Sequence, residues 1–198
     1  MNLRFLGDAL DHWKGSGFEG LQNSNVLEDF RVDAMASDID KWRSEDWSLY
    51  AKLLRVRKSK IVEHTATLER NRKEYFDEIP RSGDLFLDPD TGIKTGSDNR
   101  DIRQYLKPEE LFFLMNHEQR RVVTVYQHGS RNRAIRYRVE DVLKVLRSDQ
   151  PNCYCASYES SNVALLFLSF QSDRIEAVRG YFLELLGSHA DNRIGIWI

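Results

Sequence analysis

The stretch FLDPDTG, from Phe86 to Gly92, is an apolar run that ends abruptly in two aspartates around a proline, then a threonine and a glycine. A short apolar run closed by proline and glycine predicts a buried β-strand that ends at Asp88. Ligands of open parallel α/β sheets bind beyond the carboxyl ends of the strands. The two negative charges therefore mark a candidate functional edge of the sheet that this strand builds.

Helices and strands alternate after this stretch. KPEELFFLM predicts a helix with Pro108 at its start, RVVTVYQH a second buried strand, and VEDVLKVL another helix. CYCASY and VALLFLSF, joined by ESSN, predict a β-hairpin, and an amphipathic helix and the strand IGIWI follow it. Such alternation indicates right-handed βαβ units. We expect an α/β fold with a Rossmann-like, mostly parallel sheet flanked by helices and an antiparallel C-terminal hairpin.

The first half of the chain predicts more helix. Residues 8–21 and 44–54 show helical spacing, although three glycines weaken the first of these segments. Residues 62–79 predict one long helix, and LEDFRVDAMA alternates as a strand does. The polar segment 93–101 directly follows the DPDTG turn, and we expect it to form a mobile surface loop.

Composition bounds the class of protein. A length of 198 residues predicts a single domain over 1–198, and 41% apolar and 30% charged residues are ordinary for a globular protein. The net charge of −2 by itself points to neither a nucleic acid nor a membrane. Charge close to the N-terminus, the lack of a long apolar run and two cysteines that we expect to be reduced predict a cytoplasmic protein without a membrane partner.

Two strand ends carry candidate catalytic residues. Asp88 and Asp90 follow the first buried strand, and His128 ends the second. If the strands are neighbours, these three side chains face one crevice. Two carboxylates can hold Mg²⁺ or Mn²⁺ through oxygen, and His128 would be a general base or a third ligand. In the alternative, Asp88 caps backbone amides of its own turn and Asp90 starts an Asx-turn before Gly92.

Further side chains would complete this crevice. Tyr126 and Gln127 precede His128 and are candidate substrate-binding residues, as is Arg131, whose guanidinium suits phosphate. The basic cluster RVRKSK, by contrast, is interpreted as a solvated surface, and no aromatic residues interleave with it in the manner of a single-strand-binding surface.

The segment GDALDHWKG forms a third cluster. Asp8, Asp11 and Lys14 recur at helical spacing and share one face, which makes the two aspartates candidate metal ligands and Lys14 a candidate catalytic residue. The alternative is a solvated helix capped by Asp8. The other four histidines have no partners at ligand spacing and are interpreted as structural or surface residues: His12, His64, His117 and His189.

Two resemblances rest on these motifs. GDALDHWKG, LFLDPDTGI and VVTVYQHGSR together resemble a bacterial protein family that carries G-D-x-x-D-x-x-K, F-x-D-P-D-[NT]-G and V-x-Y-Q-H-x-x-R blocks; the resemblance spans Gly7 to Arg131 and implies no particular activity. Asp88-Pro89 and the terminal hairpin order are also similar to class I (Rossmann-like) methyltransferases that act on nucleic-acid adenines, which carry D-P-P-[YF] after a strand. This second resemblance implies S-adenosylmethionine as cofactor, although Asp90 and Thr91 replace the proline and aromatic residue and no glycine-rich loop follows.

The sequence thus leads to one hypothesis and two alternatives. The leading hypothesis is a metal-dependent phosphodiesterase or nuclease, with Mg²⁺ or Mn²⁺ on the aspartates, a proton handled by His128, and a phosphate-bearing substrate, such as a nucleic acid, held by Arg131. One alternative is a divergent methyltransferase-like protein. The other is a non-catalytic interaction subunit whose acidic crevice only stabilises loops.

Overall fold

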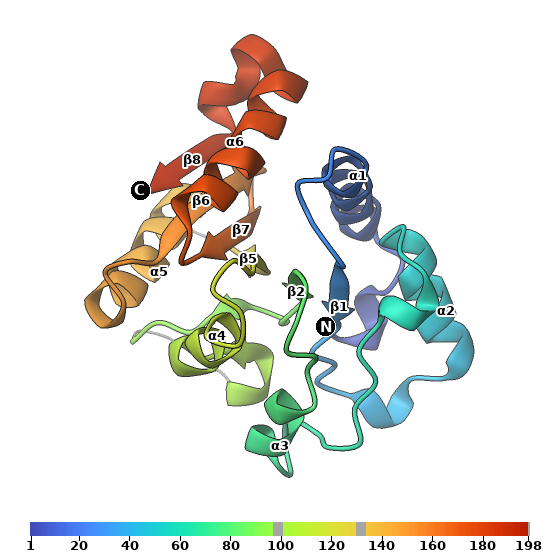
Figure 1. The fold of residues 1–198 in the computed structure, drawn as a ribbon. Helices are drawn as coiled ribbons and strands as arrows, with labels where there is room; N and C mark the ends of the chain where they lie inside the picture. The colour runs from blue at the N-terminus through green and yellow to red at the C-terminus, as the bar shows by residue number, and fades with distance from the viewer. Residues whose placement is uncertain (97–100, 130–133, 198) are drawn as a thin grey trace.

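A six-stranded sheet in the order β1-β2-β5-β7-β6-β8 runs through the centre of the protein (Figure 1). The computed structural model describes residues 1–96, 101–129 and 134–197. A separate two-stranded sheet pairs β3 with β4. The strands are Arg31–Asp33 (β1), Leu85–Leu87 (β2), Gly92–Ile93 (β3), Tyr105–Leu106 (β4), Val123–His128 (β5), Tyr154–Glu159 (β6), Val163–Ser169 (β7) and Ile194–Trp197 (β8).

The large sheet is mixed rather than mostly parallel. Strands β1, β2 and β5 are parallel to one another, so their carboxyl ends meet at one edge. The predicted hairpin is present, and its second strand, β7, lies antiparallel between β5 and β6. Strand β8 then adds antiparallel to β6. The expectation of a mostly parallel sheet therefore holds only for β1, β2 and β5. The hairpin strands β6 and β7 and the terminal strand β8 all pair antiparallel.

Helices cover both faces of this sheet, and a separate apolar core lies under each set. One core joins α1, α2 and α6 to one face, and the other joins α3, α4 and α5 to the opposite face. The α-helices are Ala9–Asn23 (α1), Ser44–Leu53 (α2), Arg72–Asp77 (α3), Pro108–Met115 (α4), Ile135–Asp149 (α5) and Ser172–Leu186 (α6). Short 3₁₀ helices span Leu3–Phe5, Ile39–Lys41, Lys58–Lys60, Ile102–Gln104 and Gly187–Asn192. No helix in the described ranges is both long and apolar enough to cross a membrane.

Glycines allow α1 to approach its neighbours closely. A Cβ atom on Gly15 would lie 2.0 Å from the carbonyl oxygen of Leu53 in α2, and one on Gly20 would lie 1.7 Å from the hydroxyl of Tyr181 in α6. Glycine lowers helix propensity, but at Gly15 a side chain would meet the backbone of α2. The close packing brings the Asp11 and Lys14 face of α1 over the end of β2.

The long helix predicted over residues 62–79 is wrong. Only α3 is helical there, and the chain before it runs as loop, with Ile61 bridged to Val32 of β1. The Glu78 carboxylate accepts hydrogen bonds from the amide of Thr65 at 2.9 Å and from the hydroxyl of the same residue. These tertiary contacts outweigh local helical spacing, because propensity differences are only tenths of a kcal/mol per residue.

Candidate active site

A crevice of about 240 Å³ opens at the carboxyl ends of β2 and β5, under the start of α1. It is called the strand-end crevice below. Three elements line it: the N-terminal segment with α1, the turn after β2, and the end of β5. Its lining residues are Met1, Asn2, Phe5, Asp8, Leu10, Asp11, Lys14, Asp88, Pro89, Asp90, Tyr126 and His128. Most candidate site residues from the sequence therefore converge here.

Lys14 forms the floor of the strand-end crevice. Its Nζ donates to Asp88 Oδ2 at 2.8 Å and lies 2.8 Å from Asp11 Oδ1, and all three side chains are almost fully buried. The ammonium also lies 4.5 Å from the centre of the Tyr126 ring, a cation–π distance. The hydroxyl of Tyr50 donates a further hydrogen bond to Asp88 Oδ2, at 2.8 Å.

Burial and neighbouring charges shift the pKa values of this inner cluster. Burial lowers the pKa of Lys14, but the Asp88 and Asp11 carboxylates raise it by more, so the side chain remains an ammonium. Burial raises the pKa of Asp11 by more than the Lys14 ammonium lowers it, and the Asp88 carboxylate adds to the increase. Burial and Asp88 raise the pKa of Tyr50 well above its ordinary value, so the phenol stays neutral and donates.

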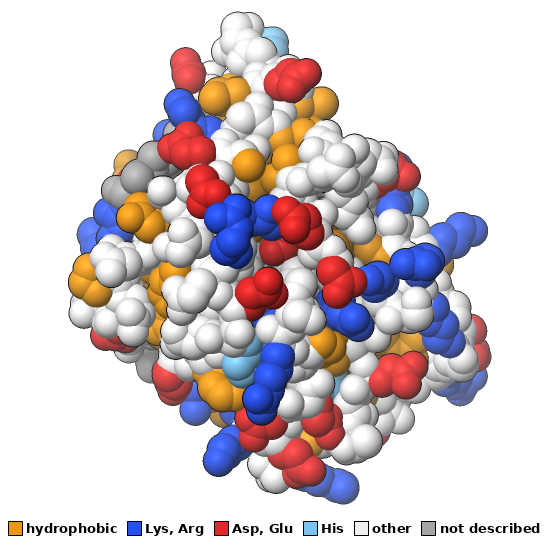
Figure 2. All heavy atoms as spheres, in the orientation of Figure 1, with side chains coloured by type: hydrophobic (Ala, Val, Ile, Leu, Met, Phe, Trp, Pro, Cys, Tyr) orange, Lys and Arg blue, Asp and Glu red, His pale blue; other side chains and the backbone are white. Residues whose placement is uncertain are grey.

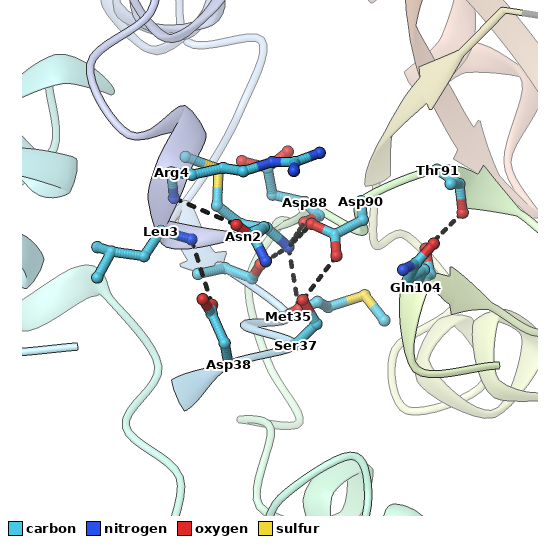
Figure 3. Close-up of polar contacts among 12 residues, drawn as sticks. Asn2, Leu3, Arg4, Met35, Ser37, Asp38, Asp88, Asp90, Thr91 and Gln104 are labelled. Carbon is cyan, nitrogen blue, oxygen red and sulfur yellow. Dashed lines mark hydrogen bonds and ion pairs between the residues drawn. The ribbon is translucent and has the colours of Figure 1, made fainter. Parts of the chain in front are cut away.

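Asp90 lies further out and has different partners. Its Oδ2 accepts a hydrogen bond from Ser37 at 2.6 Å, and its Oδ1 lies 3.3 Å from the amino group of Met1 (Figure 3). That amino group donates to the backbone carbonyls of Ala34, Met35 and Asp88 at 2.5–3.0 Å. The turn after β2 is thus joined to the end of β1 through the N-terminal segment.

Tyr126 and His128 present polar groups to the crevice from one face of β5. Their rings meet edge to face, with centroids 4.8 Å apart. Within the described residues, neither the Tyr126 hydroxyl nor the His128 imidazole has a hydrogen-bond partner. Both side chains line the crevice, which is open to solvent. Burial lowers the pKa of His128 below its ordinary value, although Asp88 opposes the shift, so the imidazole is neutral at pH 7 and can accept a proton.

Gln127 does not line the crevice. Successive residues of a strand point to opposite faces, and its amide is buried on the other side. Gln127 Oε1 accepts from the amide of Ile93 at 2.9 Å, and Nε2 donates to the carbonyl of Thr91 at 3.0 Å. Its side chain packs against Gly92, where a Cβ would lie 2.3 Å from Oε1 and where φ is +106°. Gln127 therefore anchors the DPDTG turn to β5.

The remaining predictions for the turn have mixed outcomes. Arg131 lies outside the described residues, as do residues 97–100 of the predicted loop. The described side chains include no group of three or more His, Cys, Asp or Glu arranged to hold a metal ion. Neither carboxylate after β2 makes the turn contacts of the alternative interpretation; Asp88 binds Lys14 and Tyr50 instead.

His64, which the sequence indicates to be a structural or surface residue, is a buried imidazole at the end of β1. Asp33 Oδ1 accepts from Tyr75 at 2.6 Å, and Asp33 Oδ2 lies 3.3 Å from His64 Nε2. His64 Nδ1 is 3.2 Å from Glu78, and its ring stacks on Tyr75 with centroids 3.6 Å apart. His64 is thus a buried partner of two carboxylates. No local sequence pattern reveals this cluster. Apart from Tyr75 and Glu78, its members lie 11 to 45 positions from one another along the chain.

Comparisons with known proteins give no relative. No protein-family model matches the chain, and no curated protein is significantly similar to it. The resemblances in sequence motifs therefore remain predictions, and function has to be argued from the geometry of the crevice.

Proposed function

We propose that the strand-end crevice is the active site of a phosphoester hydrolase that uses a divalent cation, of the phosphodiesterase or nuclease class. One observation carries the proposal: four carboxylates, a buried ammonium and a neutral imidazole converge at the carboxyl ends of parallel strands. This edge is where ligands of parallel sheets bind. The four carboxylates are Asp8, Asp11, Asp88 and Asp90.

The carboxylates divide into an inner and an outer pair, and the outer pair would receive the cation. Asp11 and Asp88 are about 1% exposed and share one counter-ion, the Lys14 ammonium, so burial makes them less accessible to a cation than the outer pair. Asp8 is exposed, and only its Oδ1 is used, to cap α1, among the described contacts. Asp90 is partly exposed. Mg²⁺ is commonly held by one or two carboxylates together with substrate phosphate and water, so a three-carboxylate cage is not needed.

Charge balance favours a cation-bound phosphate over a free one. Four carboxylates line the crevice against two ammonium groups, those of Lys14 and Met1. A bare phosphate would be repelled, whereas one divalent cation offsets the excess negative charge. His128 would take the proton of the attacking water, and Tyr126 would donate to a phosphate oxygen.

The test is hydrolysis of bis(p-nitrophenyl) phosphate with Mg²⁺ or Mn²⁺, with cation binding followed by calorimetry. We expect Asp8→Asn and Asp90→Asn to weaken cation binding, and His128→Gln to lower kcat by about 10²–10⁴-fold with binding retained. The matched control is Asp191→Asn, at an exposed carboxylate far along the chain. Absence of both cation binding and hydrolysis in the folded wild type would overturn the proposal.

A methyltransferase-like function is the second candidate, and one observation favours it. Strand β7 lies antiparallel between β5 and β6, and Asp88-Pro89 follows β2 beside β5, as the resemblance to adenine methyltransferases implies. The carboxylate of Asp88 is, however, already bound to Lys14 and Tyr50. S-adenosylmethionine at a hundred times its Kd would stabilise the protein by about 2.7 kcal/mol. An unchanged melting temperature would eliminate this candidate.

A further inference from the structure

Positive charge is concentrated in residues 41–60. This segment carries seven Lys or Arg residues and two acidic residues, whereas the whole chain has 29 basic and 31 acidic residues. The segment comprises α2 and the 3₁₀ helices on either side, and Figure 2 shows Lys and Arg side chains gathered over this region at the right. Six of the seven basic residues are exposed: Lys41, Arg43, Lys52, Arg55, Arg57 and Lys58, with Lys60 half-buried.

Several of these charges are available to a ligand. Arg55 pairs with Glu19, and Lys60 pairs with Asp29. In the part of the chain that the structure describes, no acidic side chain pairs with Arg43, Lys52, Arg57 or Lys58. Among the described residues, Lys58 donates only to Ser44, through a hydroxyl at 3.0 Å and a longer contact to the carbonyl.

A pocket with aromatic walls opens beside these charges. It has a volume of about 380 Å³, and its lining includes Trp42, Trp47, Ser44 and Lys58. The two indole rings lie with centroids 4.4 Å apart at an angle of 35°. Trp42 is held by a hydrogen bond from Nε1 to Asp38 at 3.2 Å, while Trp47 is half-buried. The lining of this Trp pocket thus combines two indole rings with the Lys58 ammonium and the Glu63 carboxylate.

Asp38 connects the Trp pocket to the strand-end crevice. The same Oδ1 that accepts from Trp42 also accepts from the amide of Leu3, at 3.2 Å (Figure 3). Asn2 and Phe5, one and two positions from Leu3 along the chain, line the crevice. Asp38 therefore joins a tryptophan of the Trp pocket to the segment that lines the strand-end crevice.

We propose that this surface binds single-stranded nucleic acid, with one unstacked base in the Trp pocket and phosphates on Arg43, Arg57 and Lys58. The proposal rests on the proposed function, for which it names the substrate class. Bases stack on aromatic side chains whatever their identity, and basic side chains follow the backbone. A duplex would keep its bases out of the pocket. The RVRKSK segment is expected from the sequence to be a solvated surface, but the fold places its Lys58 in one pocket with Trp42 and Trp47.

The experiment measures anisotropy of a fluorescent ten-nucleotide oligo(dT) in EDTA, so binding is separated from cation-dependent hydrolysis. We expect affinity to fall about 20-fold between 50 and 200 mM salt, as three phosphate contacts imply. Trp47→Leu should weaken binding about tenfold, and Trp47→Phe should restore most of it. Lys58→Gln should lower the salt dependence, whereas Lys144→Gln, an exposed lysine of α5, should leave it unchanged.

Three outcomes would overturn the proposal. They are no binding at 50 mM salt by the folded wild type, equal loss from Lys58→Gln and Lys144→Gln, and tighter binding of a matched duplex or of anionic lipid vesicles. Hydrolysis of the small ester without oligonucleotide binding would refute nucleic-acid binding by this surface and leave the proposed hydrolase activity standing. Oligonucleotide binding without hydrolysis would support nucleic-acid binding and refute only the proposed hydrolase activity.

Discussion

Lys14 decides the chemistry that the strand-end crevice can perform. Its ammonium lies between two buried carboxylates, 2.8 Å from an oxygen of each. The sequence predicts that Asp11 and Lys14 share a helix face, three residues apart. It does not predict Asp88 as their partner, because that contact spans 74 residues. Among the described contacts, Asp8 instead caps α1, and Asp90 binds Ser37 and the amino group of Met1.

Replacing Lys14 by methionine should destabilise the protein strongly. The substitution leaves Asp11 and Asp88 buried without a counter-ion, and breaking a buried pair in this way costs about 3–5 kcal/mol. The measurement is the free energy of unfolding in urea. Lys52→Met, at an exposed position of α2, is the control and should change it by less than about 0.5 kcal/mol. Equal effects of the two substitutions would show that the buried ion pair is absent.

Gly92 should be intolerant of any side chain. Its φ of +106° is strained for other residues, and a Cβ would meet the amide of Gln127 at 2.3–2.5 Å. Gly92→Ala should therefore destabilise the protein by about 1–3 kcal/mol. Gly180→Ala, in an exposed and open position of α6, should instead stabilise by about 0.5–1 kcal/mol. Melting temperatures that move in the same direction for both variants would contradict this account of the turn.

At the scale of elements, the loop between the 3₁₀ helix Lys58–Lys60 and α3 is held by side chains rather than by helical hydrogen bonds. His64 joins the end of β1, through Asp33, to the residue that caps α3, Glu78. The spacing of apolar residues over 62–79 also fits a helix, so the sequence predicts the wrong element there. The loop is stabilised over that helix by the Asp33 and Glu78 carboxylates, which bind the buried His64 imidazole and the backbone next to it.

Stability should depend on pH through His64. Burial lowers the pKa of His64, but Asp33 and Glu78 raise it by more, so its pKa in the folded state exceeds the ordinary value near 6.5. A raised folded pKa means that the stabilisation is complete below the unfolded pKa and is lost as pH rises through the folded pKa. The unfolding free energy difference between wild type and His64→Gln should therefore be largest below pH 6 and shrink above it. A difference independent of pH would refute the ion pairing, and His189→Gln, at an exposed position, serves as control.

At the scale of the molecule, one sheet organises both cores and the functional edge. Strands β1, β2 and β5 each end in a titratable residue, Asp33, Asp88 just past β2, and His128. The amide of Asp88 donates to the carbonyl of Asp33 at 3.0 Å, so the first two ends are joined directly. The antiparallel strands β7, β6 and β8 extend the sheet away from this edge.

The protein should unfold as one cooperative unit. Both apolar cores pack on the same sheet, so neither can be exposed without disrupting the strands that the other needs. Calorimetry should give a single transition with an enthalpy of about 140 kcal/mol near 60 °C and equal calorimetric and van't Hoff values. Two resolved transitions would contradict the single domain that the length of the chain predicts.

The sequence by itself determined the local features of this protein: a strand that ends in DPD, a second that ends in YQH, a helix face with Asp8, Asp11 and Lys14, and a terminal hairpin. Periodicity and turn chemistry encode these within a few residues. The tertiary structure alone decided that Lys14 neutralises Asp88, that Gln127 anchors the turn, and that His64 is buried between carboxylates. The physical reason is that these contacts join residues far apart in the chain, where burial and charge pairing outweigh any local preference.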